Sequence, residues 1–241
     1  MSILPDTLKN LYSPPKGGLP ADAYERDEFW RNWGFTIYRT AYGGGGDGGK
    51  QSDQHWQTLL AKIREQAEDE TRMHAGERPG AAAAAAEAER AAERLRALFR
   101  LDAHSDAALL DGASDDRLRE LYRAGEPLGE DGKPPVMHDG VPKRRHFLVA
   151  DAQVLEDAGN GRFWARCIQA DYEPEDYISR HPRWYIGQYY FGWMQMTTRS
   201  ILELWSDLET RDLEQIAPKS SDPERKDAVL YDGQLTGSGW H

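Results

Sequence analysis

The hydrophobic pattern of the chain is clearest in residues 33–42, which read Trp-Gly-Phe-Thr-Ile-Tyr-Arg-Thr-Ala-Tyr and end at a run of glycines. Aromatic and β-branched residues in this density are typical of a β-strand. The apolar side chains do not fall on one face, since Phe35 shares a side with Arg39 whereas Tyr38 lies on the other. A strand that is covered on both faces gives this pattern, so we place residues 33–42 inside a sheet rather than at its edge.

Further segments show either strand composition or the period of an amphipathic helix. Strands are predicted at residues 145–150, 162–170 and 189–196, with a short extended segment at 99–104. Helices are predicted where apolar residues recur at i, i+3, i+4 and i+7, as in Trp56-Leu59-Leu60-Ile63 and Ile201-Leu204-Trp205-Leu208, and a third helix follows a cap at Ser114. An alanine-rich helix is predicted at 81–98, after a polar stretch at 66–80.

These elements predict an α+β fold. Helices on one face of a mainly antiparallel sheet would bury the apolar stripes, and a ferredoxin-like sandwich with insertions fits the order of the elements. We expect a domain at residues 31–210 that carries a flexible low-complexity insertion at about 66–95. An N-terminal arm (residues 1–30) and a C-terminal tail (residues 211–241) would flank this domain.

Composition and charge restrict the partners and the cellular compartment that we expect for the protein. A formal net charge of −11 argues against a nucleic-acid partner and against an anionic membrane surface. The single cysteine, Cys167, cannot form an intrachain disulfide. Residues 1–6 lack a basic region followed by an apolar run, so we expect no signal peptide, and no apolar stretch is long enough for a membrane span. Together these observations predict a cytoplasmic protein.

Four short blocks of the sequence resemble a broad set of uncharacterised intracellular proteins of filamentous fungi. The blocks are Trp33-Gly34-Phe35-Thr36-Ile37-Tyr38-Arg39, Leu110-Asp111-Gly112-Ala113-Ser114, Arg145-His146-Phe147-Leu148-Val149-Ala150-Asp151 and Gly192-Trp193-Met194. The resemblance implies a fungal, intracellular, single-domain protein. It implies no activity, cofactor or catalytic residue.

Motifs for well-known chemistry are weak in this chain. Gly44 to Lys50 has the spacing of a phosphate-binding loop, but Gln51 stands where that motif requires Ser or Thr, so a low-complexity loop is favoured and phosphate binding stays open. The seven histidines show none of the common zinc-ligand spacings, and we therefore predict no metal and no cofactor. Cys167 lies within a predicted strand, where a thiol acts as a small apolar side chain.

Polar residues on the predicted strands are the best candidates for catalysis. His146 would act as an acid or base near neutral pH, and Tyr38 and Arg39 would complete a catalytic set. Arg166, Asp171 and Tyr172 would line the same cleft if one face of the sheet is left uncovered. The alternative is that the arginines form cross-strand ion pairs and that His146 is an ordinary sheet residue.

Aromatic residues are concentrated in residues 184–194, and this segment also has two interpretations. Core packing explains part of it, but the rings are more numerous than one strand buries on one face. Rings left at the surface would form a site for a partner or for self-association. The binding residues predicted here are Trp184, Tyr189, Tyr190 and Trp193.

Two functions follow from these patterns. The first is a non-catalytic cytosolic binding or self-assembly protein that forms a homo-oligomer through the aromatic strand region. The second is a metal-free small-molecule enzyme of the isomerase or cyclase type, with its pocket on the open face of the sheet. Neither function involves nucleic acid or a membrane, and a small-molecule ligand is left open.

Overall fold

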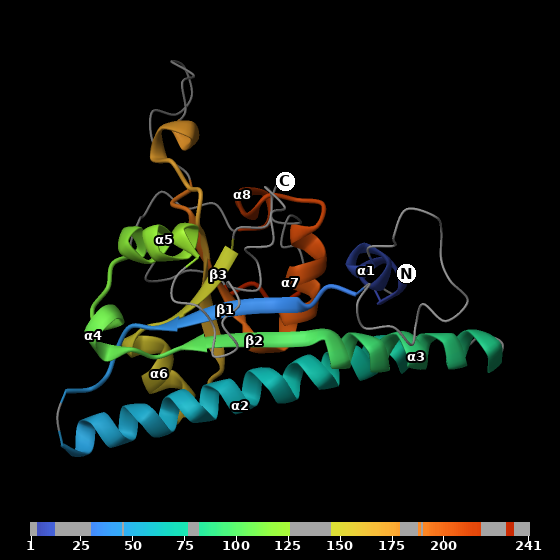
Figure 1. Cartoon of the computed structure of the whole chain (residues 1–241), viewed down its shortest axis with the longest axis horizontal. Coiled ribbons are helices and arrows are strands. Elements are labelled where there is room, and N and C mark those ends of the chain that lie inside the picture. The colour runs from blue at the N-terminus through green and yellow to red at the C-terminus, as the bar shows by residue number, and fades with distance from the viewer. Residues whose placement is uncertain are drawn as a thin grey trace.

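The structure of the protein, a computed structural model, describes residues 4–12, 30–44, 46–76, 82–125, 146–178, 188, 190–217 and 230–233. Five strands in these ranges form one sheet in the order β2-β1-β3-β4-β5 (Figure 1). They are β1 (Trp33–Arg39), β2 (Phe99–His104), β3 (His146–Ala150), β4 (Trp164–Gln169) and β5 (Trp193–Thr197). All seven residues of β1 are buried, and β1 has a strand on either side, as its two-faced apolar pattern predicts.

The sheet is mixed. β1 pairs in parallel with both β2 and β3, whereas the β3–β4 and β4–β5 pairs are antiparallel. The α+β class is therefore confirmed, but the prediction of a mainly antiparallel sheet is wrong, and the ferredoxin-like arrangement is not confirmed. Long connections that contain helices join β1 to β2 and β2 to β3. Parallel pairing requires such connections, because the chain must return to the end of the sheet at which the previous strand began.

The longer helices are α2 (Asp47–Gly76), α3 (Ala82–Leu98), α5 (Asp115–Ala124), α6 (Ala152–Gly159) and α7 (Ile201–Leu208). α1 (Leu4–Leu11) is as long as α6 and α7, and the shorter elements are α4 (Ala107–Leu110), α8 (Leu213–Ile216) and the 3-10 turns η4 (Pro174–Tyr177) and η5 (Thr198–Ser200). No helix within the described ranges combines the length and the apolar character that a membrane crossing requires.

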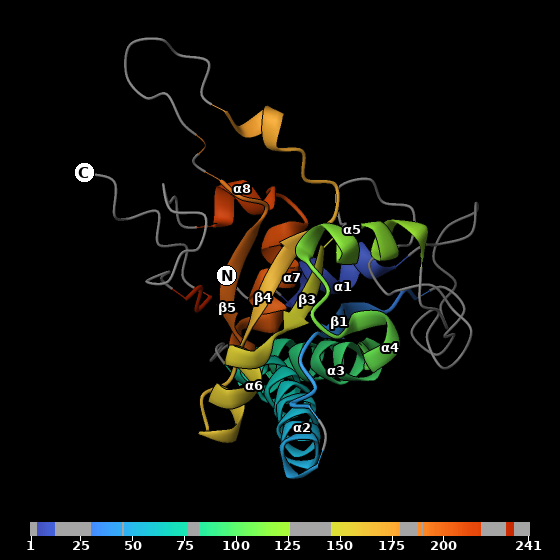
Figure 2. The same cartoon turned by 90° about the vertical axis from the view of Figure 1, so that its left-hand side faces the viewer.

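Helices cover both faces of the sheet, not one face as predicted. Trp205 of α7 packs against Phe35 with ring centroids 5.8 Å apart. Tyr122 of α5 packs against Phe147 at 5.1 Å. The register of the β1–β3 pair places Phe35 and Phe147 on opposite faces, so α7 and α5 lie on opposite sides of the sheet (Figure 2). Neither face is therefore left open as a whole.

α2 continues well beyond the predicted apolar stripe. The stripe from Trp56 to Ile63 is buried as expected, and buried positions recur at Ala67, Glu70 and Thr71. Residues 66–76, which the sequence assigned to an insertion at about 66–95, are the final turns of α2, and α3 packs beside them (Figure 1). Glu70 therefore occupies a position at which the helical period expects an apolar side chain.

Parts of both chain ends belong to the core. The leucines of α1, which lie in the predicted N-terminal arm, are buried. In the predicted C-terminal tail, Leu213 and Ile216 of α8 are buried, and so is Tyr231. Tyr231 forms a parallel bridge with Met196 and thereby extends the sheet beyond β5. Apolar residues near the ends thus complete the packing of the sheet.

Candidate functional site

The structure separates the three predicted catalytic residues. Tyr38 is fully buried on the face that α5 covers, where its ring stacks on His104 with centroids 5.4 Å apart. Burial and the nearby Asp102 carboxylate raise the pKa of the Tyr38 phenol, so the phenol stays protonated. Arg39 is the next residue of the strand and points to the opposite face. The two side chains therefore cannot act on one substrate atom.

Arg39 is engaged in fixing the end of β1 to α2. Its guanidinium donates to Asp53 Oδ1 at 2.6 Å, to Ser52 Oγ at 2.9 Å and to the main-chain oxygen of Ala41 at 2.9 Å. It also lies 4.4 Å from the centre of the Tyr42 ring. A buried guanidinium with this set of partners has little capacity left to hold an anionic ligand.

His146 lies at the opposite end of the strand pair from Arg39. The β1–β3 register aligns Arg39 with Ala150, so His146 is four residues away along the strand, or about 13 Å. Burial lowers the pKa of His146 to about 4, although the Asp212 carboxylate acts in the opposite direction. Nδ1 of the imidazole is buried and has no hydrogen-bond partner in the structure as described. His146 is thus a neutral core residue at neutral pH.

The predicted binding residues fall into two structural clusters. Arg166 makes a forked ion pair with Asp115 at 3.1 and 2.5 Å, and its guanidinium lies 4.6 Å from the centre of the Trp193 ring. This pair joins β4 to the first turn of α5. Asp171 is exposed and lies outside the pair.

Tyr172 and Tyr190 form the second cluster together with Tyr177. The three ring centroids are 4.9 to 5.8 Å apart, and the Tyr172 hydroxyl donates to the main-chain oxygen of Tyr190 at 3.1 Å. Tyr172, Tyr190 and Trp193 are all buried. The predicted residues Trp184 and Tyr189 lie outside the described residues. The rings of Tyr172, Tyr177 and Tyr190 pack on one another and leave little of their own surface for a partner. Ile178, the residue after Tyr177, is 46% exposed.

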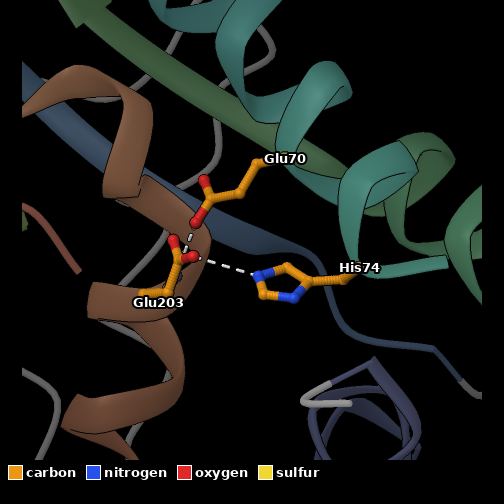
Figure 3. Close-up of side chains that lie close together, drawn as sticks. All are labelled: Glu70, His74 and Glu203. Atoms are coloured by element: carbon orange, nitrogen blue, oxygen red, sulfur yellow. Dashed lines mark hydrogen bonds and ion pairs between the residues drawn. The ribbon is translucent and has the colours of Figure 1, made fainter. Parts of the chain in front are cut away.

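A different cluster of functional groups lies between α2 and α7. Glu70 and His74 are one helical turn apart on α2, and both reach towards Glu203 on α7 (Figure 3). The Nε2 atom of His74 lies 3.0 Å from Glu203 Oε1. One potential ligand atom from each of the three residues lies within 4.8 Å of the others.

Glu70 is bound firmly to the first turn of α7. Its Oε2 accepts the main-chain N–H of Leu202 and its Oε1 accepts that of Glu203, each at 2.9 Å. The first N–H groups of a helix have no partner within the helix, and a carboxylate at that position also interacts favourably with the helix dipole. These bonds explain why a carboxylate can lie at a core position with only 3% of its surface exposed.

Glu203 is the least satisfied group of the cluster. Its Oε2 is buried and has no hydrogen-bond partner in the described part of the chain. Burial raises the pKa of Glu203 to about 6; its own main-chain N–H lowers the pKa and the Asp207 carboxylate raises it further. Buried carboxylate oxygens without a partner are rare, and a proton or a metal cation would satisfy this one.

The three side chains form a donor set for a divalent metal ion. Carboxylate oxygen and imidazole nitrogen bind zinc and similar ions at about 2.0–2.2 Å, which places neighbouring donors about 3.3 Å apart. The His74–Glu203 separation of 3.0 Å already suits this geometry. Glu70 would approach the other two by a small side-chain movement. The N–H groups on Glu70 are the outer hydrogen bonds that commonly orient a ligating carboxylate.

Sequence reasoning missed this cluster although one signal was present. Glu70 and His74 have the i, i+4 spacing that puts two ligands on one helix face, but the polar stretch around them was interpreted as an insertion. Glu203 comes 133 residues after Glu70, and no local pattern connects the two.

Comparisons of the chain with models of protein families, with curated proteins and with solved structures find no match. The resemblance to fungal proteins therefore stays a prediction.

Proposed function

We propose that the protein is a non-catalytic, cytosolic binding protein for a divalent transition-metal ion, which Glu70, His74 and Glu203 hold between α2 and α7. The observation that supports this most is the buried Oε2 of Glu203, which lacks a partner in the described ranges beside a second carboxylate and an imidazole. A bound cation would satisfy this oxygen and would offset the repulsion between the two carboxylates.

The donor set favours zinc, manganese or ferrous ions over calcium and magnesium. An imidazole nitrogen suits the first-row transition metals, whereas calcium and magnesium prefer oxygen donors throughout. Three protein ligands leave at least one coordination position for water or for a further group. The side chains of His74 and Glu203 are 11% and 24% exposed, so the ion would reach them without unfolding of the core.

Metal binding would link two distant parts of the chain. Glu70 and His74 belong to α2, which packs beside α3, while Glu203 belongs to α7, which covers β1. A ligand that binds only the folded state stabilises it by about 2.7 kcal/mol at a concentration one hundred times its dissociation constant. We therefore expect the metal to raise the melting temperature.

The test is isothermal titration of metal-free protein with Zn²⁺. Wild-type protein should bind one equivalent, and Glu203→Gln and His74→Gln should each weaken binding at least tenfold, because each removes one of three ligands. Glu68→Gln is the matched control, since Glu68 is an exposed carboxylate two residues before Glu70, on the opposite side of the same helix. Equal affinities in all four proteins would reject the site.

Self-association through the aromatic region remains a second proposal, in a reduced form. The rings of Tyr172, Tyr190 and Trp193 are buried, but Ile178, which directly follows η4, is exposed. Figure 1 shows the backbone of η4 projecting from the sheet. Light scattering over a hundredfold range of concentration tests the proposal: an oligomer that Ile178→Glu dissociates would support it, and a monomer throughout would reject it. The alternative of an isomerase or cyclase loses its support, because Tyr38, Arg39 and His146 do not converge.

A further inference from the structure

The C-terminal segment Leu230–Gly233 is attached to the edge of β5. The main-chain N–H of Tyr231 donates to Gln195 O at 3.0 Å, and the N–H of Thr197 donates to Tyr231 O at 2.8 Å. Figure 2 shows the segment as a short red stretch beside β5. Tyr231 is 2% exposed, so its side chain is an anchor, and its backbone forms a single parallel bridge with β5.

The same segment contacts α7 on the side of the candidate metal ligand. The Tyr231 hydroxyl donates to Asp207 Oδ2 at 2.8 Å, one turn beyond Glu203. Gly233 then lies directly against Glu203, because a Cβ atom added at Gly233 would be 3.3 Å from Glu203 Cδ and 3.4 Å from its Cγ. Gly233 has φ +86°, a conformation that favours glycine, so the backbone can follow this path over the carboxylate.

We infer that the segment Leu230–Gly233 is a positioning element for the metal site: it holds the Glu203 carboxylate in its place opposite Glu70 and His74. This inference rests on the proposed function. A glutamate side chain has several rotatable bonds, and a ligand that is held in its binding conformation loses less entropy when the metal binds. Packing of Gly233 on one side and the His74 bond on the other restrict Glu203 in this way.

Linkage makes the effect reciprocal. If the docked segment strengthens metal binding by a given factor, the metal must favour docking of the segment by the same factor. Outer groups that orient a ligand commonly change metal affinity by about 10–100-fold when they are removed. The structure therefore predicts that metal at the α2–α7 site protects the Tyr231–β5 hydrogen bonds, although no residue of the segment is itself a ligand.

The experiment measures Co²⁺ binding by full-length variants and amide exchange in the wild type. Tyr231→Ala should raise the dissociation constant for Co²⁺ about tenfold and should speed its removal by excess chelator. Tyr231→Phe keeps the ring and should recover much of the affinity, while Glu68→Gln, a change at an exposed residue of α2 outside the segment and the ligand set, should bind as the wild type does. In wild-type protein, saturating Zn²⁺ should slow hydrogen exchange of the Tyr231 amide by about the factor, roughly tenfold, by which Tyr231→Ala weakens Co²⁺ binding.

The outcomes separate this inference from the proposed function. If the wild type binds Co²⁺ and Tyr231→Ala binds it equally well, with exchange at Tyr231 unchanged by Zn²⁺, the inference is wrong and the proposed function stands. If the wild type binds no metal, both are wrong. Should Tyr231→Ala fail to fold, the exchange measurement on wild-type protein still decides, because it requires no substitution.

Discussion

The carboxylate of Glu70 accepts the main-chain N–H of Glu203 at 2.9 Å, across 133 residues of sequence. A helix that begins inside a protein needs partners for its first N–H groups, and α7 obtains two of them from one side chain of α2. The same contact brings the side chain of Glu203 next to His74. One structural bond between helices thus also assembles the candidate ligands.

This cap predicts a large effect of Glu70 on stability. Glu70→Ala should lower the free energy of unfolding by about 2–3 kcal/mol, because the buried N–H of Leu202 and the partly buried N–H of Glu203 lose their acceptor. Glu70→Gln should cost less, since the amide oxygen still accepts one bond. Urea denaturation of metal-free protein measures both values. Glu68→Ala on the exposed side of α2 should change stability by less than about 0.5 kcal/mol, and an equal loss at Glu68 would contradict the importance of the cap.

Gly34 allows β2 to approach β1. A Cβ atom at Gly34 would lie 1.9 Å from the main-chain oxygen of Arg100, and the residue has φ +128°. Gly34→Ala should therefore destabilise the protein by about 3 kcal/mol or more, because the strands must separate to admit the methyl group. Gly112→Ala is the control: φ is +64° there and no atom lies within 4 Å of the added carbon, so only the backbone cost of about 1 kcal/mol is expected. Similar losses at both positions in thermal denaturation would argue against the close contact.

His146 should make the protein less stable in mild acid. Its pKa is lowered from 6.5 to about 4 by burial, so the unfolded chain takes up a proton at a higher pH than the folded chain does. The contribution of His146 to the free energy of unfolding is fully present above pH 6.5. It is lost as the pH falls towards 4, by about 3 kcal/mol in total. The measurement is the unfolding free energy of wild type and His146→Leu between pH 7 and pH 4. Between pH 7 and pH 4, the unfolding free energy of His146→Leu should fall by about 3 kcal/mol less than that of the wild type. If the unfolding free energies of both proteins fall by the same amount, His146 does not titrate in this way.

Arg39 should be sensitive even to a change that keeps its charge. Arg39→Lys removes the fork that reaches Asp53 and Ser52 together, and we expect a loss of about 1–2 kcal/mol in urea denaturation. Arg72→Lys is the matched control, because Arg72 pairs with Glu68 and Asp69 on the exposed surface of α2, where such pairs contribute little. An unchanged midpoint for Arg39→Lys would mean that the hydrogen bonds to α2 are dispensable.

Local pattern was sufficient for some elements of this fold. The residues around Phe35 and Ile37 predicted a strand covered on both faces, and the stripe from Trp56 to Ile63 predicted the buried side of α2. Both predictions depend only on residues that are close together in the sequence. The pairing of strands depends on segments that are far apart, and so the sequence could not show that β1 lies in parallel between β2 and β3. The resulting mixed sheet also has helices on both faces, which removed the open face that a substrate pocket would have needed.

The candidate site escaped prediction for a related reason. A glutamate in a polar stretch normally indicates exposure, and only the meeting of α2 with α7 shows that Glu70 is buried and capping a helix. For the aromatic segment the error was the opposite one, because rings that were predicted to be exposed are buried. Tyr172, Tyr177 and Tyr190 come from different parts of a long connection and bury one another, which no count of rings along one strand reveals.

The central claim is a divalent metal ion between Glu70, His74 and Glu203, and an anomalous difference map at the zinc absorption edge tests it most directly. Crystals of protein loaded with one equivalent of Zn²⁺ should show a peak between α2 and α7, with Nε2 of His74 and a carboxylate oxygen of each glutamate about 2.0–2.2 Å from it. A map with no peak at this place, while Glu203 keeps its bond to His74, would contradict the account.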